Sequence, residues 1–174
     1  LLECGETIVF KMKGLNPEQY PAFPVYNPEF FSIPSKTLKI MIDKTVYAVS
    51  TDNTKYNLNG VYFEKREVEG KKTLRLVATD AHRLALIDRE IDGWENISIN
   101  ENSGVIVQRK GLVELRKILD DVNDNVKIGF SNNMMIVDIE KYHMLIRLVD
   151  GSFPDYEIVI PKNNEKNIII NKKH

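Results

Sequence analysis

The sequence contains one cysteine, Cys4, among its 174 residues. A single cysteine excludes an internal disulfide bond and zinc sites built from several cysteines, and it suits a reducing compartment. No apolar run approaches the about 20 residues that a membrane-spanning helix requires. Glu3, Glu6 and Lys11 interrupt the opening residues, so a signal peptide is not expected. These absences favour a cytoplasmic protein.

Strong net charge is also absent, because 24 Lys and Arg residues face 25 Asp and Glu residues and leave a net charge of −1. This balance does not indicate a nucleic-acid partner, so any DNA-facing surface must be local. The sequence has no glycine-rich phosphate loop and no cluster of metal-ligand residues, and we expect no cofactor. The chain opens at Leu1 and not at methionine, and we expect a fragment of a longer protein.

Proline is unevenly distributed, since five of the seven prolines fall within residues 15–34. They are Pro17, Pro21, Pro24, Pro28 and Pro34. This spacing is incompatible with a helix. We therefore predict an extended connector that follows a strand at residues 7–13 and precedes a domain beginning near Phe30.

Two segments carry apolar residues at the three- and four-residue steps of an amphipathic helix. The first begins at Lys36, with Ser35 as its N-cap. Its apolar positions are Leu38, Met41, Ile42, Thr45, Val46 and Val49. The second runs from about Gly111 to a turn at residues 121–125. Its apolar positions are Leu112, Leu115, Ile118, Leu119 and Val122.

Seven segments have the length and composition of β-strands. They are residues 56–63, 73–78, 83–88, 104–108, 126–130, 134–139 and 143–148. A tight turn at Asn132 and Asn133 joins two of them into a hairpin. With a further strand that contains Ile33, the order strand, helix, three strands occurs twice.

The two halves align at an offset of 74 residues. The aligned pairs are Ile33 with Val107, Lys36 with Lys110, Leu38 with Leu112, and Met41 with Leu115. Few residues are identical, so the duplication rests on the pattern. The predicted fold is α+β, a duplicated strand-helix-three-strand unit with two helices on one face of curved antiparallel sheets.

A second similarity, at an offset of 133 residues, links the proline-rich connector near residue 15 with the segment that follows the strand at residues 143–148. It pairs Leu15, Tyr20 and Pro21 with Leu148, Phe153 and Pro154. This similarity predicts domains repeated in tandem, in which residues 168–173 form the first strand of a further copy of the domain. Units repeated head to tail through short connectors build a curved array, and a ring is one way to close such an array.

The predicted helices are rich in basic residues. They carry Lys36, Lys39, Lys44, Arg109, Lys110, Arg116 and Lys117, against Asp43, Glu114, Asp120 and Asp121. A basic inner wall would attract a DNA duplex through its phosphates without reading its sequence. An ordinary solvated helix face explains the same residues, and the pattern alone favours this second interpretation.

Two motifs carry a family resemblance. Residues 76–85 read LVATDAHRLA, and residues 148–156 read LVDGSFPDY, followed by IPKN at residues 160–163. Residues 56–60 and 109–111 add further matches in the same order. From about Phe30 to Asn163 the chain resembles the bacterial DNA sliding clamps, the beta subunits of DNA polymerase III. The resemblance implies the DNA clamp fold.

The resemblance also implies a domain division and a function. Residues 1–29 would end a first clamp domain with its connector, residues 30–160 would form the complete middle domain, and residues 161–174 would begin a third. Members of the family form rings of two head-to-tail subunits that encircle duplex DNA. The ring tethers the replicative polymerase, the clamp loader and repair polymerases through short peptides. No catalysis is expected, although such a subunit is classed with DNA-directed DNA polymerase by complex membership.

The resemblance places a partner-peptide pocket between the second and third domains. The third domain would supply one wall, and this chain would supply at most half of the site: Leu58, Thr79, Ala81, His82, Arg83, Leu84, Pro154, Ile158 and Val159. Leucine, proline and valine side chains offer apolar surface for peptide anchors, and Thr79, His82 and Arg83 offer hydrogen-bond donors. Ile158 departs from the arginine that is frequent in the family.

The resemblance also places DNA contacts at the turn of residues 50–57. Lys55 would meet a phosphate and Tyr56 would stack on a base, whereas Asn57 stands where some members have a second tyrosine. An ordinary polar turn is an equal alternative. The complete set of expected DNA-facing residues is Lys36, Lys39, Lys55, Tyr56, Arg109, Lys110 and Arg116.

Two other classes of function remain as alternatives. Thr79, Asp80 and His82 could form an acid-base or nucleophilic group, but no nucleophile elbow accompanies them. A protein-interaction module that never meets DNA would share the pocket but not the ring. Because family rings close through first- and third-domain contacts, we expect this chain alone to be a monomer or to pair weakly.

Overall fold

A repeated unit of one strand, one helix and a three-stranded meander forms most of the molecule. The computed structural model describes residues 2–5, 8–20, 22, 25–99, 103–140, 142–162 and 168–169. The first unit comprises β3 (Phe31–Pro34), α1 (Ser35–Thr45), β4 (Gly60–Val68), β5 (Lys71–Thr79) and β6 (Leu84–Glu90). The second comprises β7 (Val105–Gln108), α2 (Arg109–Ile118), β8 (Asn125–Ser131), β9 (Met134–Ile139) and β10 (Tyr142–Val149). The predicted duplication is confirmed.

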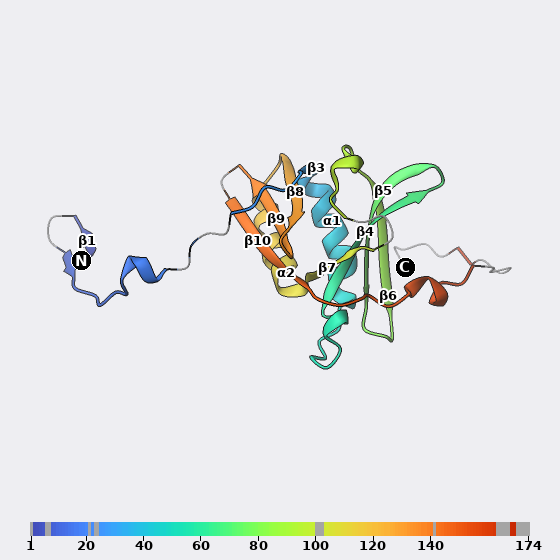
Figure 1. The fold of residues 1–174 in the computed structure, drawn as a ribbon, viewed down its shortest axis with the longest axis horizontal. Coiled ribbons are helices and arrows are strands. Elements are labelled where there is room, and N and C mark those ends of the chain that lie inside the picture. Colours follow the sequence, from blue (N-terminus) through green and yellow to red (C-terminus); the bar gives the residue numbers. More distant parts are fainter. Residues whose placement is uncertain are drawn as a thin grey trace.

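The strands of both units join one antiparallel sheet with the order β3-β8-β9-β10-β7-β4-β5-β6 (Figure 1). The opening strand of each unit pairs with the meander of the other, because β3 lies beside β8 and β7 lies beside β4. Only two residue pairs, Leu148 with Val107 and Val149 with Ile106, link β10 to β7. The sheet is therefore two four-stranded halves with exchanged opening strands.

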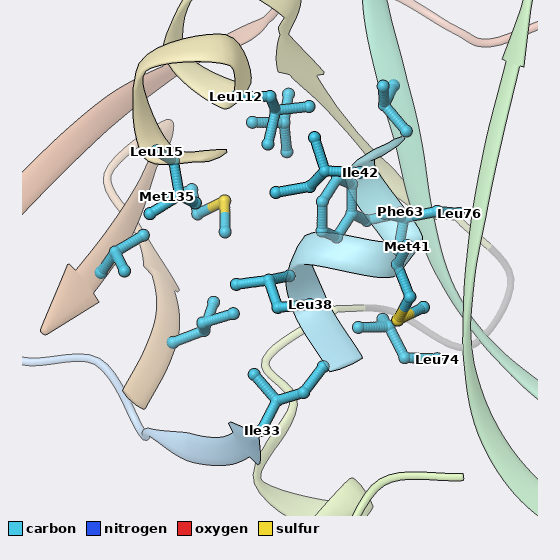
Figure 2. Close-up of a cluster of buried hydrophobic side chains, with 14 of the residues drawn as sticks. Ile33, Leu38, Met41, Ile42, Phe63, Leu74, Leu76, Leu112, Leu115 and Met135 are labelled. Carbon is cyan, nitrogen blue, oxygen red and sulfur yellow. The ribbon is translucent and has the colours of Figure 1, made fainter. Parts of the chain in front are cut away.

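The two helices lie between the sheet halves, and the core forms around them (Figures 1 and 2). The apolar residues that align at the offset of 74 residues are also equally buried in the structure. Ile33, Val107, Leu38, Leu112, Met41 and Leu115 all have 0 % exposure. The helix periodicity thus identifies the face of each helix that packs on the sheet.

The two helix starts differ from the prediction. Ser35 does not cap α1, since Pro34 is the N-cap residue and makes no side-chain capping bond. The Ser35 hydroxyl instead donates a 2.7 Å hydrogen bond to the carbonyl of Val122, just beyond α2. The second helix begins at Arg109, before Gly111. A Cβ at Gly111 would lie 2.3 Å from Cγ2 of Ile146, so glycine permits the close packing of α2 on β10.

The predicted strands are found with small shifts of their ends, apart from residues 56–63. Tyr56–Leu58 form a 3-10 turn, and β4 begins only at Gly60. A Cβ at Gly60 would lie 2.4 Å from the carbonyl oxygen of Val107, so this start of β4 needs a glycine. The hairpin turn between β8 and β9 is confirmed, with positive φ at Asn132 (50°) and Asn133 (60°).

At the N-terminal end, Figure 1 shows a small hairpin away from the main sheet. It pairs β2 (Ile8–Phe10), which was predicted within residues 7–13, with β1 (Leu2–Cys4), which was not predicted. The connector that follows contains one 3-10 turn at Pro17–Gln19, so the exclusion of any helix was wrong for this turn. Pro17 is tolerated as the first residue of this turn, because the backbone N–H that proline lacks would have no hydrogen-bond partner within the turn. The predicted strand at residues 168–173 lies mostly outside the described residues.

Candidate functional site

The turn between β5 and β6 is built by two side chains. The Thr79 hydroxyl donates to the carbonyl of Arg83 (2.8 Å) and accepts from the backbone N–H of Ala81 (3.1 Å). The Asp80 carboxylate accepts from the backbone N–H groups of His82 and Arg83, both at 3.0 Å. These bonds lower the pKa of Asp80, with a smaller effect from the Arg83 guanidinium. The turn thereby presents the side chains of residues 81–84 outward.

The connector after β10 is fixed to the outer face of the sheet by aromatic contacts. The ring of Phe153 stacks on Tyr62, with centroids 4.8 Å apart and planes 8° from parallel. Tyr156 is only 6 % exposed, and its hydroxyl donates to Glu64 and accepts from Arg75 Nη1 (3.3 Å). The carboxylate of Asp155 accepts from the N–H of Glu157 (3.1 Å) and caps a 3-10 turn.

The turn, the connector and Leu58 enclose a hollow of about 460 Å³, which we call the connector hollow. All nine residues that the resemblance placed in a partner pocket line it: Leu58, Thr79, Ala81, His82, Arg83, Leu84, Pro154, Ile158 and Val159. Ile158 (79 % exposed) and Val159 (64 % exposed) leave large apolar surfaces uncovered at its edge. Such uncovered apolar surface is typical of interaction sites.

Sequence reasoning missed two residues of the connector hollow, Asp155 and Tyr156. Both lie in the FPDY segment of the quoted motif. A tyrosine between two acidic residues, Asp155 and Glu157, gave no sign of burial, because its contacts with Glu64 and Arg75 depend on how distant strands align. The motif was the available signal for both residues.

The Asp80 carboxylate, a candidate for an acid-base pair with His82, binds groups of its own turn. The Asp80 carboxylate is engaged by two backbone N–H groups and by Arg83 Nε at 3.0 Å. Arg83 itself lies over the ring of Tyr47, 5.8 Å from its centroid. Within the part of the chain that the structure describes, no group of acidic, histidine or cysteine side chains is arranged to hold a metal ion.

The expected DNA-facing residues fall into separate groups. Tyr56, Arg109 and Lys110 line a hollow of about 580 Å³ between the turn after α1 and the start of α2. Lys55 and Arg109 line a neighbouring hollow of about 360 Å³, together with His82 and Arg83. This second hollow lies between the turn and the connector hollow, because its lining shares two residues with the connector hollow.

The remaining three residues lie on the helices. Lys39 is paired with Asp120, and Arg116 Nε lies 2.5 Å from Asp43 Oδ1 and its Nη1 3.5 Å from Asp120 Oδ2. These pairs join the middle and last turn of α1 to the end of α2 and the turn that follows it. The start of α1 also lies beside this end of α2, because Ser35 binds the carbonyl groups of Val122 and Asp124, so Lys36 lies at the opposite end of α2 from Arg109. Two of the expected DNA contacts therefore already have acidic partners.

Among the described segments, none of the helices has the length and apolar character needed to cross a membrane. The family model of the DNA polymerase III beta subunit, central domain, matches residues 32–155. The beta sliding clamp of Bacillus subtilis is 36 % identical over 165 residues, which is 94 % of this chain.

Two solved structures share the fold. The pol III beta of Caulobacter crescentus superposes with a TM-score of 0.79 at 33 % identity, over 87 % of this chain and 40 % of that one. The sliding clamp of Bartonella birtlesii, solved bound to griselimycin, has a TM-score of 0.78 at 36 % identity, over the same shares. The chain spans only 42 % of the length of the Bacillus relative. On the family-model match and this identity, the chain belongs to the family of DNA polymerase III beta subunits, the beta sliding clamps.

Proposed function

We propose that this chain is the central part of a sliding-clamp subunit that encircles duplex DNA and holds the replicative polymerase on it. Residues 30–160 would be the complete middle domain, flanked by the end of a first domain (1–29) and the start of a third (161–174). The family match to residues 32–155 lies within the proposed middle domain. The full-length protein would be a ring-shaped homodimer in the bacterial cytoplasm.

The observation that carries this proposal is the connector hollow. Two segments far apart in the sequence, the turn after β5 and the connector after β10, converge there and leave Ile158 and Val159 exposed. Apolar surface beside the donors of His82 and Arg83 suits a short peptide with leucine or phenylalanine anchors. Polymerases, the clamp loader and repair polymerases would each bring such a peptide.

The DNA role follows from enclosure and weak contacts. A ring that slides should attract phosphates without binding any sequence tightly. Lys55, Tyr56, Arg109 and Lys110 cluster around the turn after α1 and support such contacts. The role requires no catalytic residue, so we expect no nucleotidyl transfer by this chain itself.

The decisive experiment is fluorescence polarisation of a labelled Gln-x-x-Leu-Phe peptide with the full-length protein. Replacing Leu84 and Pro154 by alanine should weaken binding at least about tenfold, because both remove apolar surface from the connector hollow. Tyr142→Phe is the control, since Tyr142 is exposed in β10 and outside the hollow. Griselimycin, which was solved bound to the Bartonella relative, should compete with the peptide. If the full-length protein does not bind the peptide, the proposed partner-binding role is wrong.

A further inference from the structure

We propose that Tyr156 is a positioning residue: a row of charged side chains on the sheet holds its hydroxyl and so fixes the connector wall of the partner pocket before a partner arrives. The inference rests on the proposed peptide-binding function and concerns residues that the family resemblance did not bring into the pocket.

The row consists of directly opposed residues on three neighbouring strands. Glu64 of β4 is the register partner of Arg75 of β5, and Arg75 is the register partner of Asp88 of β6. Their neighbours Phe63 and Leu76 point into the core, so the row lies on the outward face of the sheet. Opposed charges of alternating sign stabilise one another across strands.

Arg75 is held rigidly within this row. Its Nε and Nη2 atoms bind the two carboxylate oxygens of Asp88 at 2.7 and 2.9 Å, which is a bidentate pair. The Arg75 side chain is only 11 % exposed. Its remaining nitrogen, Nη1, donates to the Tyr156 hydroxyl at 3.3 Å, and that hydroxyl donates to Glu64. The row therefore offers one acceptor and one donor at a fixed position, and a phenol hydroxyl satisfies both.

Burial raises the pKa of Tyr156, and the hydrogen bond to Glu64 raises it further, so the phenol remains a neutral donor at physiological pH. The tyrosine ring also has edge contacts with Tyr62 and Phe153, at centroid distances of 6.5 and 6.4 Å. The next residue, Glu157, pairs with Arg66 of β4 and lies 3.9 Å from Lys162. Two consecutive connector residues are thus tied to the sheet.

The exposed residues Ile158 and Val159 follow directly after these two anchors. Without the anchors, the connector would gain conformational freedom, and a peptide would have to order it on binding. Anchoring removes that cost in advance, which is the general effect of preorganisation on affinity. Tyr156 therefore acts on the peptide through the placement of its neighbours.

The test is peptide affinity in the full-length protein, with the labelled Gln-x-x-Leu-Phe peptide as probe. Tyr156→Phe keeps the ring and removes only the hydroxyl, so we expect about 3- to 10-fold weaker binding, the effect of one net hydrogen bond. Tyr142→Phe makes the same chemical change at an exposed site outside the hollow and should leave affinity unchanged. Glu64→Ala, which removes the acceptor, should weaken binding to a similar extent.

Two readouts separate positioning from loss of structure. Amide hydrogen exchange of residues 157–160 should accelerate in Tyr156→Phe, while exchange in β8, β9 and β10 stays at the wild-type rate. The double variant Tyr156→Phe with Glu64→Ala should bind no more weakly than either single variant, because both break the same contact.

The outcomes distinguish this inference from the proposed function. If the wild-type protein binds the peptide and Tyr156→Phe binds it equally well, the positioning role is wrong and the pocket stands. If the wild-type protein does not bind the peptide, the pocket itself is wrong and the positioning role falls with it. Weaker binding by Tyr156→Phe with unchanged amide exchange of residues 157–160 would also overturn the role, since the connector would then be no looser than in the wild-type protein.

Discussion

Ala81 has a backbone φ of 78°, in the left-handed region that residues with a Cβ atom rarely adopt. The bonds that Thr79 and Asp80 make to the following backbone hold it there. Such a conformation costs a non-glycine residue about 1–2 kcal/mol. The turn of the connector hollow therefore stores strain at an exposed residue.

This strain predicts the outcome of glycine substitution. Ala81→Gly should raise the free energy of unfolding by up to about 1 kcal/mol, because relief of strain exceeds the added flexibility of the unfolded chain. Urea unfolding measures the change. Ala85→Gly, four residues later in β6, should instead lower stability, since Ala85 is buried and has no positive φ to relieve. Equal changes in both variants would contradict the strain argument.

Asp80 predicts a pH dependence of the same turn. Its pKa is lowered below the ordinary value of 3.8, chiefly by hydrogen bonds from His82 and Arg83 N–H groups. A lowered folded-state pKa contributes stability that is present above the unfolded pKa and is lost as pH falls through the folded pKa.

NMR titration of the His82 and Arg83 amides should therefore show a transition in the wild-type protein at a pH below the ordinary carboxyl value of 3.8. Asp80→Asn should abolish this transition, because the amide oxygen still accepts hydrogen bonds but does not titrate. A transition that persists in the variant would assign the titration to another group.

For individual residues, the sequence predicted the lining of the connector hollow only through the family motifs. Nothing in the spacing of Leu58, Thr79 and Pro154 brings them together, because their proximity depends on the sheet topology. Tyr156 was missed for the same reason, since its partners Glu64 and Arg75 become neighbours only once β4 and β5 are in register.

The helices were the most predictable elements, because periodic burial is a local property of the sequence. Their ends were less predictable. Serine is a residue type that is favoured at the N-cap position. The Ser35 hydroxyl nevertheless donates to the carbonyl of Val122, which lies 87 residues away in the sequence. The predicted strand at residues 56–63 failed at its start for a similar reason, because close contact with Val107 fixes the first residue of β4.

Ion pairs across the helices predict how DNA affinity is tuned. Asp120 pairs with both Lys39 and Arg116, and Arg116 also pairs with Asp43, so Asp120→Asn should free Lys39, leave Arg116 bound to Asp43, and remove one negative charge. We expect tighter binding of a short DNA duplex at low salt, and a dependence on log[salt] that is steeper by about 1. Fluorescence anisotropy over a range of salt concentrations measures both quantities.

Asp121→Asn is the matched control for this prediction. Asp121 is exposed, adjacent, and makes none of the ion pairs found in the described part of the chain. The net charge changes equally in both variants. If the two variants bind DNA equally, only the overall charge matters and the freed Lys39 makes no contact with DNA.

For the molecule as a whole, we expect the 174-residue chain to sediment as a monomer or as a weak pair. The family resemblance assigns ring closure to first- and third-domain contacts, and the family match of this chain covers the central domain. Analytical ultracentrifugation over a range of concentrations tests this. A stable dimer at low concentration would show that this chain carries a closing interface of its own.

The exchange of opening strands between the two units also determines how the domain folds. Neither half supplies the edge partner that its own meander requires, because β3 completes the second half and β7 completes the first. The two repeated units therefore form one folded sheet that neither can complete alone. Damage to either copy must destabilise both, and the duplication provides no redundancy against mutation.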